Sequence, residues 1–179
     1  MNLINKIDSF EELPWEKVYE IHSETLSDDI FHTFGKNTEK RFLKFLINTN
    51  KGLILIAKEG AIITGFIIIR LQPISMIRFI RKDSLFSFID HVIIDPKIFL
   101  KLVIRLIFSL KTKTPFGYAE LDYFAVIKEY RGKSIGRELL KEAEYIIKKS
   151  GLKGISTITN NRNLLNFYMK NKNARVCFN

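Results

Sequence analysis

The sequence predicts a single domain of the α/β (α+β) class, in which helices and strands interleave around a mixed central sheet. Three observations predict this class. The chain has 179 residues, the length of one domain with a full hydrophobic core. Hydrophobic residues make up 46% and charged residues 27%, which is a globular composition. Segments with helical periodicity alternate with short segments rich in β-branched residues.

Two helices are predicted in the N-terminal part. Residues 13–26 carry apolar side chains at helical spacing, with Pro14 in the first turn. A polar stretch follows at 27–36. Asn37 is then the expected N-cap of a second helix, whose aromatic and aliphatic side chains share one face.

A β-hairpin and a long connection come next. Residues 52–58 and 61–71 are rich in β-branched side chains, and Glu59-Gly60 between them is typical of a hairpin turn. Residues 72–116 form a predicted helical insert, apolar and basic. The insert precedes the strand that carries the most informative motif.

The C-terminal part alternates strands and helices. A strand at 118–126 leads through a basic turn to a helix from Ser134 to Lys149, which Gly151 ends. Residues 154–159 are a predicted strand and 161–170 a short helix. The last residues, from Asn173, would form one more short strand.

The charge and the cysteine content limit the function classes. Lys and Arg number 29 against 19 Asp and Glu, so the formal net charge is +10 and a polyanionic partner is expected. Cys177 is the single cysteine, which excludes an internal disulfide and favours a reducing compartment, the cytoplasm. The three histidines and this cysteine lack metal-ligand spacing, so no metal site is expected. Neither a signal peptide nor a membrane-spanning helix is expected.

The segment ELDYFAVIKEYRGKSIGRELL has the features of an anion-binding site. A helix start presents unpaired N–H groups and the positive end of the helix dipole. Gly132 and Gly136 allow backbone amides to approach a diphosphate, and Arg131, Lys133 and Arg137 add positive charge. By itself the pattern indicates a phosphate-bearing ligand, or else a capped surface helix with a basic first turn.

The segment resembles the GNAT superfamily of acetyl-CoA-dependent N-acetyltransferases. The superfamily has the signature [QR]-x-x-G-x-[GA] directly after a strand. The run from Arg131 to Gly136 matches it, except that Ser134 stands at the first motif glycine. The family also has an Asn followed seven residues later by a Tyr, and Asn161 and Tyr168 match that pair. The resemblance implies a GNAT fold for residues 1–179, with 117–170 as the acetyl-CoA-binding core.

The resemblance implies roles for individual residues. The backbone of Phe124, Ala125 and Val126 would bind the pantetheine arm where this strand separates from its neighbour. The cradle for the pyrophosphate would consist of Arg131, Gly132, Lys133, Ser134, Ile135, Gly136 and Arg137. Asn161 would hydrogen-bond the cofactor, and Tyr168 would protonate the leaving thiolate. A packed core aromatic is the alternative for Tyr168.

The catalytic base is expected among two carboxylates of the same strand. Some family members carry a catalytic glutamate at the position of Glu120, and strand alternation puts Asp122 on the same face. Convergence of the two would raise one of their pKa values toward the working pH. A water relay, or binding of the substrate ammonium, remains open. Relatives that acetylate ribosomal protein N-termini have a glutamate where this chain has Ser156, which counts against that substrate class.

The insert and the C-terminal end each allow more than one structural interpretation. Within residues 96–110, Lys97, Lys101 and Arg105 form a basic stripe on an apolar helix. Three interpretations stand: a core helix with its cations at the surface, a homodimer or partner face, or an interfacial membrane helix. Acceptor specificity is expected from the insert and from residues 31–35, where His32 is a candidate contact. We expect the last strand of the family to be missing here or to come from another chain.

Competing functions follow from these patterns. The leading one is direct transfer of acetyl from acetyl-CoA to a primary amine of a small molecule in a ternary complex. By family analogy the acceptor is an amino sugar or amino-sugar nucleotide. The alternatives are a non-catalytic acyl-CoA-binding or regulatory protein of the same fold, or an enzyme that acetylates protein or peptide amines. Nucleic-acid binding is not expected, because the basic residues are not organised into a recognition motif.

Overall fold

A five-stranded mixed sheet in the order β1-β2-β3-β4-β5 forms the centre of the computed structural model. The structure describes residues 3–25, 36–74, 114–159 and 162–170. The first four strands are antiparallel to their neighbours, whereas β5 is parallel to β4. The strands are β1 (Leu3–Lys6), β2 (Gly52–Glu59), β3 (Ile62–Arg70), β4 (Tyr118–Val126) and β5 (Gly154–Ser156).

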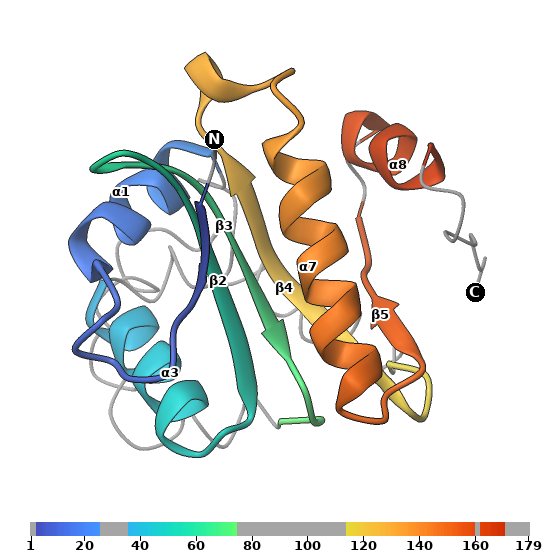
Figure 1. Cartoon of the computed structure of the whole chain (residues 1–179). Helices are drawn as coiled ribbons and strands as arrows, with labels where there is room; N and C mark the ends of the chain where they lie inside the picture. The colour runs from blue at the N-terminus through green and yellow to red at the C-terminus, as the bar shows by residue number, and fades with distance from the viewer. Residues whose placement is uncertain (1–2, 26–35, 75–113, 160–161, 171–179) are drawn as a thin grey trace, which may run out of the picture.

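Helices cover both faces of this sheet (Figure 1). One face carries α1 and α3, the other carries α7, and α8 lies beyond β5. A 3-10 turn, η1, connects β4 toward α7. The helical elements are α1 (Trp15–Thr25), α3 (Lys36–Asn48), η1 (Lys128–Tyr130), α7 (Ile135–Lys149) and α8 (Arg162–Met169). The mixed sheet with helices on both faces confirms the predicted fold class.

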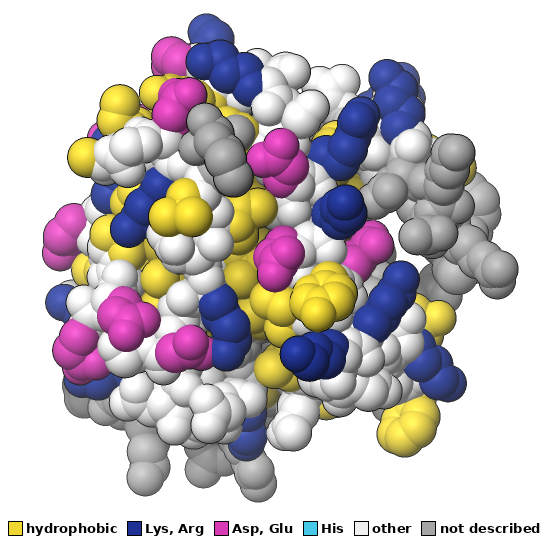
Figure 2. Space-filling model, viewed as in Figure 1, with side chains coloured by type: hydrophobic (Ala, Val, Ile, Leu, Met, Phe, Trp, Pro, Cys, Tyr) yellow, Lys and Arg dark blue, Asp and Glu magenta, His cyan; other side chains and the backbone are white. Residues whose placement is uncertain are grey.

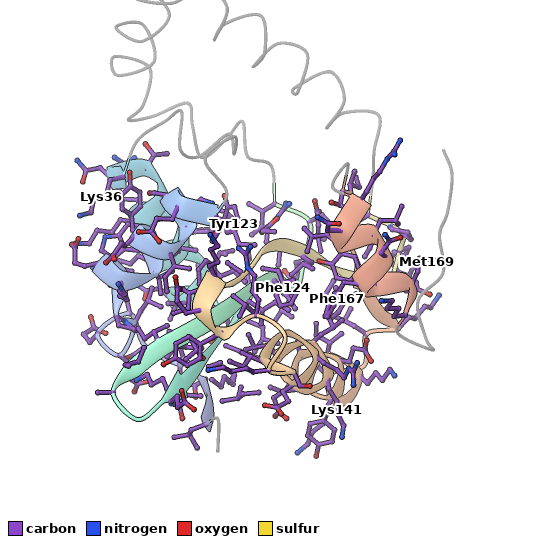
Figure 3. All side chains as sticks on the ribbon, turned by 90° about the horizontal axis from the view of Figure 1, so that it is seen from above. Lys36, Tyr123, Phe124, Lys141, Phe167 and Met169 are labelled. Atoms are coloured by element: carbon purple, nitrogen blue, oxygen red, sulfur yellow. The ribbon has the colours of Figure 1, made fainter. Side chains whose placement is uncertain are left out.

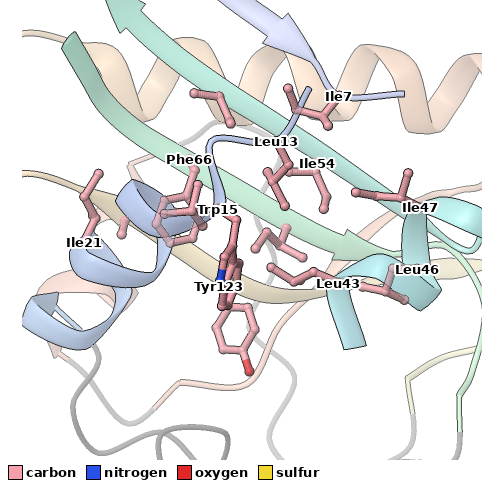
Figure 4. Packing of buried hydrophobic residues seen from close by; sticks show 14 of the residues in the cluster. Ile7, Leu13, Trp15, Ile21, Leu43, Leu46, Ile47, Ile54, Phe66 and Tyr123 are labelled. Atoms are coloured by element: carbon pink, nitrogen blue, oxygen red, sulfur yellow. The ribbon is translucent and has the colours of Figure 1, made fainter. Parts of the chain in front are cut away.

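Two hydrophobic clusters hold the layers together, one on each face of the sheet. Trp15 and Ile21 of α1 and Leu43 of α3 pack with Phe66 and Tyr123 of the sheet in the first cluster (Figure 4). The second cluster joins α7 to the opposite face, and its members include Leu55, Ile67, Leu139, Ala143 and Ile147. Because β2 and β3 are covered on both faces, they are apolar along nearly their whole length rather than alternating.

The observed elements differ from the sequence predictions by one or two residues at several ends, and more clearly in the following places. Strand β1 was not predicted, because its four residues are too few and too polar to show a period. Asn37 does not cap α3 but lies inside it, since the helix begins at Lys36. Strand β5 ends at Ser156 rather than at 159, and α8 is a residue shorter at each end than predicted. Several predicted features lie outside the described residues, namely His32, the 96–110 helix, Asn161 and the strand from Asn173.

A buried polar pair connects the two helices of the first face. His22 of α1 and Glu39 of α3 have side-chain exposures of 0% and 1%, and Nδ1 of His22 lies 2.8 Å from Oε1 of Glu39. The His22 ring also packs on Tyr123 of β4, with 4.4 Å between ring centroids. The pair therefore fixes α1 and α3 relative to each other and to the strand that carries the predicted carboxylates.

We expect Glu39→Ala to lower the free energy of unfolding by about 3 kcal/mol, because it removes one member of a buried polar pair. Glu39→Gln keeps the size of the side chain and an acceptor oxygen toward His22, so its loss is smaller. Glu24→Ala, an exposed change on α1, is the control. Denaturant unfolding of the three variants measures the difference. Equal stability of Glu39→Ala and the wild type would contradict this role of the pair.

Candidate functional site

A β-bulge divides β4 into two parts. Ile68 of β3 faces Tyr123, but the next residue, Ile69, faces Leu121, so Asp122 is the extra residue of β4. Before the bulge, Leu121 belongs to the cluster under α7, and after it Tyr123 belongs to the cluster under α1 and α3. The bulge therefore reverses which side chains of β4 face each layer, and simple alternation along the whole strand does not hold.

Both predicted carboxylates of β4 meet at Arg70, the last residue of β3. Nε of Arg70 donates to Oδ2 of Asp122 at 2.7 Å and Nη2 to Oδ1 at 2.8 Å, a two-pronged contact. The same Nη2 lies 2.7 Å from Oε1 of Glu120. Glu120 and Asp122 thus share one side of the sheet, as predicted, but they do so around a cation. We call these three side chains the Arg70 cluster.

The side chains of the Arg70 cluster differ in exposure. Those of Arg70 and Asp122 are 10% and 11% exposed, whereas that of Glu120 is 34% exposed. Burial opposes the charge of Arg70, but its hydrogen bond to Asp122 and the attraction of both carboxylates raise its pKa above its ordinary value. Thr114 donates its hydroxyl to Oε2 of Glu120 at 2.6 Å. Glu120 is therefore the carboxylate of the cluster that solvent reaches.

Beyond Glu120 the strands β4 and β5 stop pairing. Their register ends with Glu120 opposite Ser156, although β4 continues to Val126. Thr157, which follows β5, reaches back only through its hydroxyl, 3.5 Å from the carbonyl oxygen of Leu121. Within the described residues, the β5-side edge of β4 from Asp122 onward thus has no neighbouring strand. Phe124, Ala125 and Val126 lie on this part of β4.

The 128–134 loop connects this edge to the N-terminus of α7. Nε of Arg131 donates to the carbonyl oxygen of Val126 at 3.0 Å, which ties the loop to the end of β4. The amide of Glu138 is bonded to the carbonyl of Ser134, so the three amides before it, beginning with Ile135, have no acceptor within the helix. The side chain of Ile135 is in the core, and only its backbone can contact a ligand.

Ser134 has a left-handed backbone. It is the N-cap of α7 with φ 64° and ψ 0°, and its side chain makes no capping hydrogen bond. A side chain in this region costs free energy that glycine does not. Gly132 also has a positive φ, of 81°, and open space where a Cβ would be. The backbone is therefore left-handed at both positions, which favours glycine. The chain has glycine at position 132 but serine at position 134.

Phe124 of β4 and Phe167 of α8 lie side by side near the start of α7 (Figure 3). The ring of Phe124 lies 5.6 Å from that of Phe167 and 6.3 Å from that of Tyr168. A Cβ on Gly136 would lie 3.0 Å from Cζ of Phe124. Gly136 thus allows this aromatic packing, a reason for glycine that is separate from approach to a diphosphate.

The hydroxyl of Tyr168 is held in its neutral form. Burial raises the pKa of Tyr168 from its ordinary value of 10.0 to about 12. Its ring packs edge-on against Phe167, with 5.5 Å between centroids. Tyr168 packs with the α7-side cluster, whereas the Arg70 cluster faces the other side of the sheet. The unpaired edge of β4 lies between the two.

The three predicted cations of the 128–137 region are all exposed, namely Arg131, Lys133 and Arg137. Lys133 places Nζ 4.3 Å above the ring of Tyr130. Figure 2 shows basic side chains at the upper edge of the face that α7 covers, and others over the rest of that face with acidic side chains between them. The positive charge is thus not confined to the loop.

Sequence reasoning missed two members of the carboxylate site, Arg70 and Thr114. The available signal for Arg70 was a basic residue at the end of an otherwise apolar strand. It follows Phe66 and Ile68 at every second position, on the face that α1 and α3 cover. No pattern marked Thr114. The predicted cofactor contact Asn161 lies outside the described residues, so its position relative to Tyr168 remains a prediction.

Comparison with known proteins identifies the family. A family model described as the acetyltransferase (GNAT) family matches residues 15–172, so the chain belongs to the GNAT acetyltransferases. It is therefore an acyltransferase, as the resemblance of the Arg131–Gly136 run and of the Asn161 and Tyr168 pair to the GNAT superfamily implied. No curated protein matches the chain.

Solved structures agree on the fold. A structure of a predicted acetyltransferase of Clostridium acetobutylicum with acetyl-CoA is 13% identical with a TM-score of 0.60, covering 98% of this chain and 92% of that one. The PaiA N-acetyltransferase of Thermoplasma acidophilum with coenzyme A is 21% identical, with a TM-score of 0.54 and coverages of 94% and 88%. An aminoglycoside acetyltransferase from an uncultured soil sample, with sisomicin, is 13% identical, with a TM-score of 0.58 and coverages of 99% and 94%.

The described residues contain no helix with the length and apolar character needed to cross a membrane. In the same residues, no three or more His, Cys, Asp or Glu side chains gather in a way that could hold a metal ion.

We expect Ser134→Gly to raise the free energy of unfolding by about 0.5–1 kcal/mol, because glycine adopts the left-handed backbone without strain. Ser150→Gly is the matched control, since Ser150 ends α7 with φ −82° and its hydroxyl bonds a carbonyl. Thermal unfolding of both variants measures the difference. A loss of stability in Ser134→Gly as large as in Ser150→Gly would show that the strain argument is wrong.

Proposed function

We propose that this protein transfers the acetyl group of acetyl-CoA directly to a primary amine of a small molecule, in a ternary complex. The observation that carries the proposal is the unpaired edge of β4 between two differently charged sites. The cationic 128–137 loop lies at one end of this edge, and the Arg70 cluster lies where pairing with β5 ends.

The cationic loop suits the diphosphate of the donor. The unbonded amides of the first turn of α7 and the exposed Arg131, Lys133 and Arg137 offer hydrogen bonds and charge to an anion. We assign the pantetheine arm to the edge formed by Phe124, Ala125 and Val126, where backbone groups would hydrogen-bond its amides, and we assign Asn161 to the same ligand.

The Arg70 cluster suits the acceptor. Its two carboxylates exceed its one guanidinium in charge, so it attracts the ammonium form of an amine. Glu120, which is only partly buried, accepts a proton from that ammonium, and the free amine then attacks the acetyl carbon. Asp122 is the second candidate for the base, directly or through a water.

Tyr168 completes the proton transfers in this proposal. The C–N bond forms, the C–S bond breaks, and the phenol of Tyr168 gives its proton to the leaving sulfur. The second proton that the nitrogen loses on becoming an amide goes to solvent, from which the phenol regains its proton, and Glu120 returns the first proton to solvent. Burial raises the pKa of Tyr168 to about 12, so the phenol is protonated at working pH, and the same rise makes it a weaker acid whose proton transfer depends on its position beside the sulfur. Holding both reactants at the unpaired edge supplies the proximity that direct transfer needs.

An amino sugar or an amino-sugar nucleotide is the proposed acceptor class. The sisomicin complex of an aminoglycoside acetyltransferase supports amino sugars as acceptors within this fold. Ser156 lies opposite Glu120 in the β4–β5 register and cannot act as a base, which counts against protein N-termini. The single cysteine supports the cytoplasm as the compartment.

We expect thiol release from acetyl-CoA with at least one amino sugar, amino-sugar nucleotide or aminoglycoside, and a lower rate with a peptide that begins with alanine. Glu120→Gln reduces kcat about 100-fold or more, because it removes the base. Glu142→Gln on α7 is the control with unchanged rate. A thiol reagent follows the rate, and mass spectrometry confirms the acetylated amine. Tight acetyl-CoA binding without turnover on any amine would contradict the proposal.

We expect Tyr168→Phe to lower kcat about 100-fold while acetyl-CoA binding is retained. The wild-type free energy of unfolding also falls as pH rises from 10.0 to about 12, because the folded state keeps a proton on Tyr168 that the unfolded chain loses. This fall is smaller in Tyr168→Phe. Tyr145→Phe, an exposed tyrosine on α7, is the control. Equal kcat in Tyr168→Phe and the wild type would exclude the acid role.

A further inference from the structure

We propose that Arg70 is a positioning residue, which holds Asp122 as part of the scaffold and orients Glu120 as the carboxylate that takes the proton. The inference rests on the proposed function, in which Glu120 is the base. It assigns different tasks to two carboxylates that the sequence left as alternatives.

The contacts of Arg70 distinguish the two carboxylates. Asp122 receives both prongs of the guanidinium, from Nε at 2.7 Å and from Nη2 at 2.8 Å, and is 11% exposed. A carboxylate held at both oxygens in this way is not free to turn toward a substrate. Glu120 receives only Nη2, at 2.7 Å on Oε1, and is 34% exposed.

The second oxygen of Glu120 accepts a hydrogen bond that an approaching amine can replace. Thr114 donates its hydroxyl to Oε2 at 2.6 Å. A hydroxyl can rotate away when an ammonium approaches, whereas the fork of Arg70 is anchored by the buried Asp122. Glu120 is thus aligned through one oxygen, and the other remains the one that an amine can reach.

The backbone explains why this arrangement needs arginine. Arg70 and Glu120 are opposite each other in the β3–β4 register, and the bulge adds Asp122 on the same side. The planar guanidinium donates to both oxygens of Asp122 and to Glu120 from one position, so it fixes the direction of each carboxylate as well as balancing its charge. A lysine at position 70 would keep the charge but would provide one nitrogen for both acceptors.

Two variants of Arg70 separate positioning from folding. Arg70→Lys keeps the charge and loses the fork, and we expect kcat to fall roughly 10- to 100-fold, because a small misplacement of a catalytic group is costly. The KM for acetyl-CoA stays unchanged, because the donor is assigned to the loop and the β4 edge.

The double variant Arg70→Gln with Asp122→Asn removes both buried charges, so we expect its melting temperature to exceed that of Arg70→Gln alone. Its kcat stays low, because Glu120 still lacks its guanidinium.

Matched controls complete the experiment. Arg41→Lys, an exposed arginine on α3, keeps wild-type kcat and melting temperature. Wild-type kcat in Arg70→Lys would overturn the inference, and so would recovery of kcat together with the melting temperature in the double variant. Glu120→Gln, measured in the same series, tests the proposed function separately. If Glu120→Gln is as fast as the wild type, that function assignment fails; if it is slow while Arg70→Lys is fast, the role of Arg70 alone fails.

Discussion

The bulge at Asp122 is the constraint on which the rest of this site depends. One extra residue in β4 reverses the direction of the side chains that follow it, so Phe124 turns toward α7 while Tyr123 turns toward α1. A regular strand would have put Phe124 on the face of Glu120. Because of the bulge, the carboxylates and the aromatic packing at α8 lie on different faces of the same strand.

In the proposed function, the donor and the acceptor approach the unpaired edge of β4 from opposite faces of the sheet. The proposed donor site, with its basic loop and helix N-terminus, lies on the α7 side, where Gly136 allows Phe124 to pack closely. The carboxylates proposed for the acceptor lie on the α1 and α3 side, which the His22 and Glu39 pair stabilises. In the described residues the strand edge between them is unpaired, and direct transfer requires that the two reactants be held close together.

Charge is distributed by the same logic. A net charge of +10 suggested a polyanionic partner, and the exposed cations of the 128–137 region supply one defined place for an anion. The Arg70 cluster, on the face that α1 and α3 cover, carries a net negative charge, because its two carboxylates, Glu120 and Asp122, outnumber its one guanidinium. Arg70 counts toward the net charge of +10, but between its two carboxylates it belongs to a locally negative cluster.

The sequence by itself determined the fold class and the order of most strands and helices, and it predicted the anion-binding loop and the two candidate carboxylates. These depend on local periodicity, turn residues and a motif that is contiguous in the chain, apart from short elements such as β1. Only the tertiary structure decided that Arg70 joins Glu120 to Asp122, that β4 carries a bulge, and that Gly136 serves Phe124. These features depend on cross-strand register and on packing between distant segments, and neighbours along the chain carry no information about either.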